Sequence, residues 1–439
     1  MRYFRAKPQG IALSKRGCEP CPRLRFPVED PGSIEPDTAF PNMGMQWSCA
    51  MKVICERAAL LEAVNQVSSV VASRSPRPQL TCIKLSATKS NEGDELTLSG
   101  TDAEIALSVR IGRVDVVEEG SSLVPADKLR QIVSAEDNEN TLTIETSADT
   151  THIKGEDAHF TLHGFDPKDY PVIADYKTLA EGSPASAPAK TVYSTDAGIL
   201  DSLITRTLFA AARENSRYAI NGVLMVRDGK KLEMVATDGR RLAKSAVTIA
   251  TSGDPAQCII PSKALSMLQK LTGDENEPVH IAVTDNQAVF AFGDEPTDSR
   301  AVLTTNLVEG TFPPYEDVIP RDLDIKVTFN RDTLASAVKR AALLTNEESR
   351  GVRMAFTGSD KSLMLSSRAP EMGEATINVD LADYDGNDIE IGFNPAFITD
   401  ALKVITDPQI MIELKAPNKP GLFKAGSDFM YVVMPVNLS

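Results

Sequence analysis

Apolar residues recur at helical spacing in six segments of this chain, and between those segments they alternate with polar residues. In the segment 57–71, for example, Leu60, Leu61, Val64 and Val67 fall on one stripe, as in an amphipathic helix. Short alternating runs such as Ile105–Ile111 predict half-buried β-strands. The predicted helices are Arg57–Val71, the end of Leu123–Val133, Ala197–Ala212, Ser262–Leu271, Arg331–Leu344 and Pro395–Ile405.

One motif, an apolar strand end that meets a proline and continues into a short amphipathic helix, occurs three times. Its prolines are Pro125, Pro261 and Pro395, and we expect Pro261 in the first turn of its helix, where a missing N–H costs nothing. Successive copies lie about 135 residues apart, whereas solenoid repeats have periods of about 20–50 residues. The chain is therefore predicted to contain three homologous domains.

Each repeat also contains a smaller one, because its second helix follows the first by about 65–70 residues. Every domain should then consist of two strand–helix–strands units. Six such units predict an α+β fold with helices on one side and sheets on the other.

The predicted domain limits follow from the repeats and from composition. We expect domains at 51–178, 191–321 and 322–439, with a linker rich in Pro and Ser at 179–190. Residues 1–50 are rich in proline, lack periodicity and share nothing with the repeats. Two explanations compete: a disordered tail, or an upstream start codon assigned in error, with true initiation at Met51 or Met45. We favour the second and expect no ordered fold there.

Composition narrows the class of protein. Lys and Arg number 46 against 61 Asp and Glu, for a net charge of −15, which argues against a general nucleic-acid coat. No apolar run is long enough to span a membrane. The cysteines show no disulfide framework, which suits a reducing cytosol and predicts a cytoplasmic protein. Cys18 and Cys21 form the one pair with metal-ligand spacing, and it lacks a second pair.

Catalytic motifs are scarce in the sequence. It contains no phosphate-binding loop, no nucleophile elbow and no His-Glu-x-x-His pair. His152, His159 and His163 make a metal cluster conceivable, so a metal- or nucleotide-dependent enzyme is the rival hypothesis; histidines on an exposed strand face are the simpler interpretation. The turn 237–242 is interpreted as a structural turn with a surface basic pair, Arg240 and Arg241, and not as a phosphate site. We predict no cofactor and no metal.

The helical segments and their ends carry more cations than the chain as a whole. If the helices share one face, that face is weakly basic and attracts phosphates without reading bases. Solvated helix surfaces explain the same pattern equally well, so charge alone does not decide. The cations are Arg57, Lys128, Arg130, Arg206, Arg213, Arg217, Lys263, Lys270, Arg331, Lys339, Arg340, Arg350, Arg353 and Lys403.

Several short motifs together resemble one family. They are 218–222 (Tyr-Ala-Ile-Asn-Gly), 236–243 (Ala-Thr-Asp-Gly-Arg-Arg-Leu-Ala), 345–353, 391–395 and the terminal Val-Val-Met-Pro at 432–435. From Met51 onward the sequence resembles the bacterial sliding-clamp family, the β subunits of DNA polymerase III. Residues 1–50 have no counterpart in that family.

The resemblance implies the DNA-clamp fold and a head-to-tail homodimeric ring, with helices lining the hole and sheets outside. It implies a non-catalytic processivity factor that encircles double-stranded DNA and tethers the polymerase by topology and effective concentration. The implied partners are the clamp loader, the α subunit of the replicative polymerase, and other polymerases and repair proteins that carry clamp-binding peptides.

The resemblance also implies site residues. Phe160, Leu162, Leu343 and Leu344 would form the dimer interface, and Arg74, Arg77, Arg213 and Arg217 would contact DNA. Asp317 and Ser349 stand where the family often has Arg and Phe, which bears on partner preference. The implied partner-peptide groove consists of Ile220, Thr237, Gly239, Arg241, Leu242, Pro313, Val318, Asn394, Phe397, Val432, Val433, Met434 and Pro435.

Overall fold

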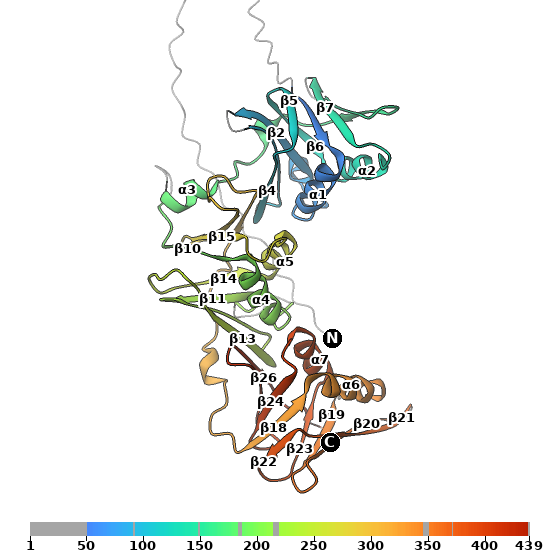
Figure 1. Cartoon of the computed structure of the whole chain (residues 1–439), viewed down its shortest axis with the longest axis vertical. Helices are drawn as coiled ribbons and strands as arrows, with labels where there is room; N and C mark the ends of the chain where they lie inside the picture. Colours follow the sequence, from blue (N-terminus) through green and yellow to red (C-terminus); the bar gives the residue numbers. More distant parts are fainter. Residues whose placement is uncertain are drawn as a thin grey trace, which may run out of the picture. The chain divides into compact units, whose positions relative to one another are not determined.

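The computed structural model describes residues 51–90, 93–147, 150–182, 187–213, 219–345, 351–370 and 372–437. The segment 1–50, for which no ordered fold was predicted, lies outside the described residues. The remaining chain folds as three α+β domains, which contain strands β1–β9, β10–β17 and β18–β26 (Figure 1). The predicted fold class is confirmed.

The first sheet belongs wholly to the first domain and has five strands in the order β5-β1-β7-β8-β9. All its ladders are antiparallel, and its inward side chains, such as Val53 and Ile144, are fully buried. Strand β9 lies at one edge. The strands are β1 (Lys52–Glu56), β5 (Val114–Glu118), β7 (Thr141–Ser147), β8 (Thr150–Lys154) and β9 (His159–His163).

The second sheet has eight strands and crosses from the first domain into the second, in the order β10-β15-β16-β17-β4-β3-β2-β6. The crossing is the antiparallel pair β17–β4, in which Leu303 lies opposite Leu107. The strands are β2 (Cys82–Ser90), β3 (Gly93–Thr101), β4 (Ile105–Ile111), β6 (Gly120–Pro125), β10 (Thr191–Asp196), β15 (Pro278–Val283), β16 (Gln287–Phe292) and β17 (Ala301–Asn306).

The third sheet crosses from the second domain into the third in the same manner, in the order β14-β11-β12-β13-β26-β25-β24-β18-β22. Here the crossing pair is β13–β26, in which Ala243 lies opposite Tyr431. The strands are β11 (Gly222–Asp228), β12 (Lys231–Thr237), β13 (Arg241–Thr248), β14 (Ala256–Pro261), β18 (Ile325–Asn330), β22 (Asp383–Asp385), β24 (Gln409–Leu414), β25 (Gly421–Ala425) and β26 (Phe429–Val433).

The fourth sheet lies in the third domain and has four strands in the order β21-β20-β19-β23, with β21 at one edge. Its core-facing side chains, among them Met354 and Leu365, are fully buried. The strands are β19 (Val352–Thr357), β20 (Ser362–Ala369), β21 (Gly373–Asp380) and β23 (Ile389–Phe393).

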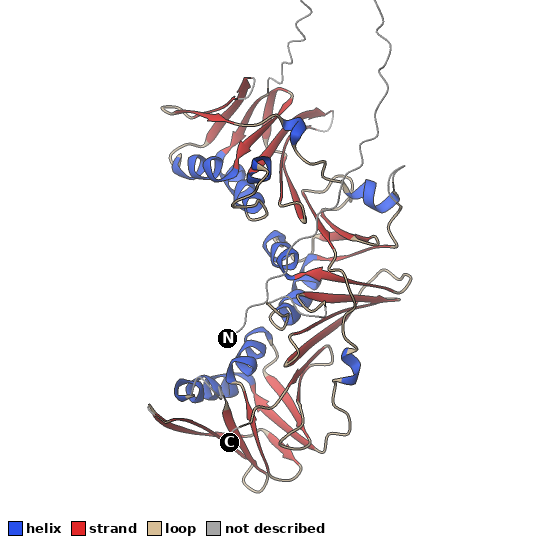
Figure 2. Cartoon of the chain, turned by 180° about the vertical axis from the view of Figure 1, so that it is seen from behind, coloured by secondary structure: helices blue, strands red, loops and turns tan. Residues whose placement is uncertain are grey.

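Two helices pack against each other in every domain and bury their apolar stripes against the strands (Figure 2). Most end earlier than the periodicity predicted; for example, α1 stops at Ser68 and α4 at Leu208, because tight turns follow. The pairs are α1 (Arg57–Ser68) with α2 (Ala126–Ala135), α4 (Ala197–Leu208) with α5 (Ser262–Leu271), and α6 (Arg331–Ala341) with α7 (Pro395–Val404).

The repeated proline does not have the same place in all three copies. Pro125 and Pro261 are the last residues of β6 and β14 and occupy the N-cap position, so the prediction that Pro261 begins the helix was wrong by one residue. In the third copy Pro395 is the first helical residue, and Asn394 is the N-cap whose side chain accepts the N–H of Ala396 at 3.0 Å. The structural equivalent of Pro261 is therefore Asn394.

The predicted linker 179–190 begins inside an ordered element. Helix α3 (Tyr176–Glu181) covers it as far as Glu181, and Asp175 caps this helix by accepting the N–H of Thr178 at 2.7 Å. Tyr176 and Leu179 are buried against β15 and β16 of the second domain. The large apolar side chains at the start of this segment are therefore packed, although its composition resembles a linker.

Candidate functional site: an apolar groove and two sheet edges

A small apolar groove lies where the second sheet-crossing pair, β13–β26, meets the segment that follows β17. Its volume is about 180 Å³. It brings together nine of the predicted groove residues, and adds Arg240 and Tyr315, which the sequence analysis did not include. The lining residues are Ile220, Thr237, Gly239, Arg240, Arg241, Leu242, Pro313, Tyr315, Val318, Val432 and Met434.

The other four predicted groove residues lie nearby without lining this groove. Val433 is fully buried, and Asn394 serves as the cap of α7. Phe397 lies under the Arg241 guanidinium, 4.6 Å from ring centre to Cζ. Pro435 lines a separate hollow together with Met434.

The turn between β12 and β13 forms one wall of the groove. The Thr237 hydroxyl donates to the Arg241 carbonyl at 2.7 Å and accepts the N–H of Gly239 at 3.1 Å. Asp238 accepts the N–H groups of Arg240 and Arg241 at 2.9 and 3.0 Å. Gly239 has φ +84°, in the region that favours glycine. The expectation of a structural turn agrees with this geometry, but the expected surface basic pair is wrong for Arg241, whose side chain is held inside the protein while Arg240 is exposed.

Arg241 ties the second domain to the third. Its Nε donates to Asp238 at 3.0 Å, one terminal nitrogen donates to Asp400 of α7 at 2.9 Å, and the other donates to the Phe209 carbonyl at 2.8 Å. Its side chain is only 10% exposed. Burial alone would lower the pKa of Arg241, but the hydrogen bond to Asp400 and the charge of Asp238 outweigh it and raise that pKa. Its charge is therefore compensated inside the protein.

Tyr315 forms the opposite wall and belongs to the single turn η3 (Tyr315–Asp317). Its hydroxyl donates to Glu233 at 2.8 Å, and the Lys244 ammonium lies 5.1 Å from its ring centre. Burial would raise the pKa of Glu233, but hydrogen bonds from Lys231, Lys244 and Tyr315 lower it. Burial and the neighbouring Glu233 raise the pKa of Tyr315. This network fixes the wall to β12 and β13.

Two of the four predicted interface residues lie in the edge strand of the first sheet, and the other two lie beside the edge strand of the fourth sheet. Phe160 and Leu162 are half-buried on the core-facing side of edge strand β9. Leu343 and Leu344 belong to the single turn η4 (Ala342–Leu344), which lies against β20 and the edge strand β21. Leu343 is 74% exposed.

The predicted DNA-contacting arginines follow the first helix of a repeat. Arg74 and Arg77 are exposed in the loop after α1, and Arg213 is exposed after α4. Arg217 lies outside the described residues, as does Ser349. Several helix cations are already engaged: Arg57 and Arg331 donate to carbonyls at the ends of α2 and α7.

The histidines on the first sheet are exposed or half-buried, as the simpler interpretation predicted. The rings of His152 and His159 approach each other, with Nδ1 and Nε2 3.2 Å apart, and His152 also contacts the Thr161 hydroxyl at 3.1 Å. His163 is exposed at the end of β9. Hydrogen bonds within the sheet therefore account for the pair.

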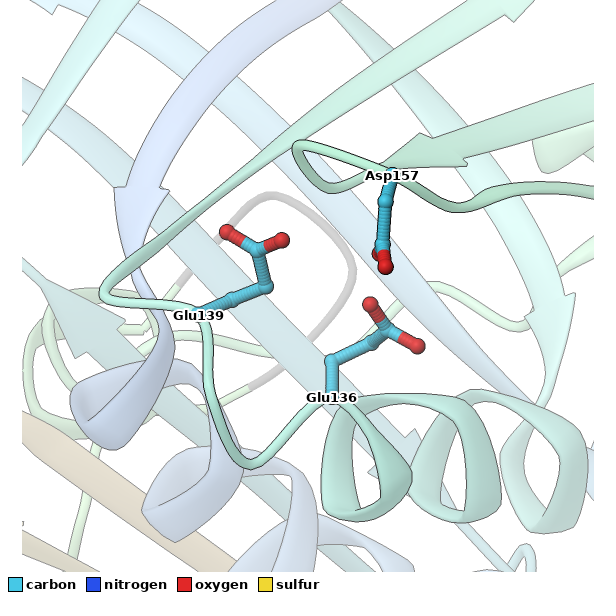
Figure 3. A group of neighbouring side chains, drawn as sticks. All are labelled: Glu136, Glu139 and Asp157. Atoms are coloured by element: carbon cyan, nitrogen blue, oxygen red, sulfur yellow. The ribbon is translucent and has the colours of Figure 1, made fainter.

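One group of carboxylates, Glu136, Glu139 and Asp157, has ligand atoms close enough to share a cation (Figure 3). Glu139 is already used, because it accepts the N–H of Glu156 at 2.7 Å and so caps the turn before β9. Exposed acidic groups commonly cluster without a metal, so this group is not assigned as a site. Among the described residues, no helix is long and apolar enough to cross a membrane.

Three family models match the chain in succession. They are the N-terminal, central and C-terminal domains of the DNA polymerase III beta subunit, at residues 51–174, 195–314 and 316–437. The Pseudomonas aeruginosa protein named beta sliding clamp is 34% identical over 391 residues, which are 88% of this chain and 100% of that protein. The beta sliding clamp of Caulobacter vibrioides is 33% identical, with the same shares covered.

Solved structures agree with these sequence matches. A crystal structure of the Pseudomonas aeruginosa sliding clamp bound to griselimycin superposes on this chain with a TM-score of 0.80 and 32% sequence identity. The match covers 89% of this chain and 100% of the Pseudomonas chain. The sliding clamp of Bacillus subtilis gives a TM-score of 0.79 at 26% identity, with the same coverage. The likeness therefore extends over all three domains.

Proposed function

The chain belongs to the DNA polymerase III beta subunit family, and from this premise we propose that two copies close head to tail into a ring around duplex DNA. Its function is that of a sliding clamp, the processivity factor of DNA polymerase III, which is not itself catalytic. The rival hypothesis of a metal- or nucleotide-dependent enzyme is therefore set aside. Because this function is exercised on replicating DNA, we place the protein in the cytoplasm.

The observation that carries the ring is a regularity of the sheets. The second and third sheets each contain strands from two successive domains, joined edge to edge by an antiparallel pair. The first and fourth sheets contain strands from one domain each and end at β9 and β21. Unpaired edges are a liability that native proteins manage by pairing or covering them. Pairing β9 of one copy with β21 of the other gives a third junction of the same kind.

The register of that third junction can be derived from the two internal ones. We start from the residue before the second helix of each domain and follow its ladder partners from strand to strand as far as the strand at the junction. This makes Ala106, Leu242 and Glu374 equivalent. The same procedure is applied to the strands that follow the first helix of each domain, starting from the residue before that helix. It makes Thr304, Val432 and Thr161 equivalent.

The two counts agree with each other. Ala106 lies opposite Thr304 at the first junction, and Leu242 lies opposite Val432 at the second. The proposed third junction therefore sets Glu374 opposite Thr161 of the partner subunit. One residue further along, Ala375 would lie opposite the partner's Phe160, so the core-facing side chains of both edges would meet.

The test of the ring uses this register. In a chain with Cys18, Cys21 and Cys49 changed to Ser, Thr161→Cys with Glu374→Cys should be joined across subunits by a short thiol cross-linker. Directly opposite residues have Cβ atoms about 4.5–5.5 Å apart. Thr161→Cys with Asp380→Cys is the off-register control and should stay unlinked. Light scattering should give twice the chain mass of 47.4 kDa; a monomer at micromolar concentration would refute the ring.

We further propose that the groove anchors a peptide segment of each partner, including the α subunit of the replicative polymerase, the clamp loader, and other polymerases and repair proteins. The groove supports this because its walls are mostly apolar while the fixed Arg241 and Tyr315 shape it. Val318 and Met434 remain 46% and 39% exposed at its mouth, as anchoring surfaces for an apolar side chain.

For DNA we propose contacts from Arg74, Arg77, Arg213 and Arg217, through phosphates and without base recognition. A topological link is tested directly. The clamp should be retained on nicked circular DNA after loader action and escape once that DNA is linearised. Changing Arg74 and Arg77 to Ala should weaken loading more at low salt than at high salt, because a variant with fewer phosphate contacts releases fewer counterions and depends less steeply on salt. Equal escape from circular and linear DNA would contradict encirclement.

A further inference from the structure

A second hollow adjoins the groove, and its charge is of one sign. It has a volume of about 550 Å³ and lies beside the segment that follows β17. Four carboxylates line it: Asp285, Glu309, Glu316 and Asp317. None of the residues that line it is Lys, Arg or His. We refer to it as the acidic pocket.

The acidic pocket and the groove share a wall. Pro313 and Tyr315 line both hollows. Asp317 lines the acidic pocket, and the next residue, Val318, lines the groove. Since Tyr315 is held by Glu233 of β12, this shared wall is fixed to the sheet and the two hollows keep their relative position. A segment that leaves the groove over this wall would therefore pass next to the carboxylates.

The charges at the groove do not offset the carboxylates. Arg241 lines the groove, but its guanidinium is paired with Asp238 and Asp400. Lys190 forms an ion pair with Asp285. The other three carboxylates of the acidic pocket, Glu309, Glu316 and Asp317, are exposed. Arg240 is the one exposed cation among the groove-lining residues and belongs to the turn before β13. The groove is therefore flanked by carboxylates beyond its Tyr315 wall and by the exposed Arg240 on the wall formed by that turn.

We propose that the partner segments of this clamp carry Lys or Arg beside their apolar anchor, and that these cations enter the acidic pocket. The inference rests on the proposed peptide-binding function of the groove and adds the chemistry of its ligand. Electrostatic complementarity of this kind selects among partners and speeds their association more than it adds affinity. Partners with an acidic flank at that end would be disfavoured, because like charges would be brought together.

The expected effects are moderate because the carboxylates are exposed. Surface ion pairs contribute little individually, so two or three of them together should change the dissociation constant by about three- to tenfold. Salt should remove most of the difference, since the Debye length falls from about 10 Å at 0.1 M to about 3 Å at 1 M ionic strength.

The test uses three labelled peptides that share one core of two leucines and a phenylalanine and differ only in the flank. One flank is Lys-Arg, one is Gln-Ser and one is Glu-Asp, and binding to the full chain is measured by fluorescence anisotropy. We expect the Lys-Arg peptide to bind about tenfold more tightly than the Glu-Asp peptide. In the double variant Glu316→Gln, Asp317→Asn the preference should fall to within about twofold.

A charge-reversed variant and a distant control complete the test. Asp317→Arg changes the charge of the acidic pocket by the same two units as the double variant and should also bring the preference to within about twofold, whereas Asp360→Asn, an exposed acid in the third domain, should leave it unchanged. If all three peptides bind alike, the groove assignment stands and this inference is overturned. If none binds, the groove assignment itself fails, and the inference fails with it.

Discussion

The two internal junctions, β4–β17 and β13–β26, have the same register but differ in what they expose. At the first, Ile105, Ala106 and Thr304 occupy the positions that Arg241, Leu242 and Val432 occupy at the second. Where the second set offers the apolar pair Leu242 and Val432, the first has Ala106 and Thr304, and a buried isoleucine replaces the fixed guanidinium. The groove therefore arises from a few side-chain changes at a joint that otherwise only holds domains together.

The turns that precede these junctions support the same conclusion. Asp102 accepts the N–H groups of Glu104 and Ile105, as Asp238 does for Arg240 and Arg241. Asp102 then pairs with Lys263 of α5 on the surface. Asp238 pairs instead with Arg241, which reaches Asp400 across the domain boundary. One turn geometry thus serves two different contacts.

The largest expected effect is a loss of stability when the contacts of Arg241 are removed. Arg241→Ala removes a buried cation and leaves Asp238 and Asp400 without it, so we expect a loss of about 3–5 kcal/mol in the free energy of unfolding. Arg110→Ala at the first junction removes pairs with Glu95 and Asp298 that are partly solvated and should cost under about 1 kcal/mol. Urea unfolding monitored by circular dichroism measures both; equal losses would contradict the comparison.

Converting the second junction toward the first should abolish the groove. The double variant Leu242→Ala, Val432→Thr removes two buried apolar side chains that contact each other across the joint. We expect peptide affinity to fall about 100-fold, as for truncation of anchor contacts worth about 2–3 kcal/mol. Leu303→Ala is the matched control: it should cost about 2–5 kcal/mol of stability and leave peptide affinity unchanged.

Substitution of an exposed groove residue should weaken peptide binding without changing the stability of the fold. Met434→Ala should weaken peptide binding several-fold while the free energy of unfolding stays within about 0.5 kcal/mol. Met411→Ala, which is similarly exposed on β24, should change neither quantity. Anisotropy titration and chemical denaturation on the same samples decide the matter; an equal effect of both substitutions on binding would remove Met434 from the groove.

The smallest expected effect is a dependence on pH at the Tyr315 wall. The pKa of Glu233 is lowered in the folded state, so its contribution to stability is fully present above its ordinary value of 4.5 and is lost as the pH falls below it. Glu233→Gln should therefore flatten the fall in stability between about pH 5 and pH 3. Tyr315→Phe should flatten it less, because the lysines remain. An unchanged slope in Glu233→Gln would show that Glu233 does not contribute.

The sequence predicted the elements better than their junctions. The three proline joints and the helical stripes are local patterns, so α5 was predicted residue by residue. The position of Pro261 was predicted wrongly by one residue, because local sequence does not show whether a proline precedes a helix or begins it. The linker prediction failed at Leu179, since composition does not reveal that a short helix packs on β15.

The groove was predicted only through resemblance, and in part. Its residues come from β13, β26 and the segment after β17, which no local pattern brings together. Arg240 was missed although it stands beside Arg241. Tyr315 was missed because its buried partner is Glu233, and a lone acid in strand β12 gives no sign in the sequence that it is buried.

The pairing of β13 with β26 has a consequence for the order of synthesis. These strands lie about 190 residues apart, and at about 5–20 residues per second a ribosome needs about 10–40 s to make the second after the first. During that time the edge of β13 and the side chain of Leu242 lack their partners. A nascent chain consequently has no groove until β26 has been made and has paired with β13.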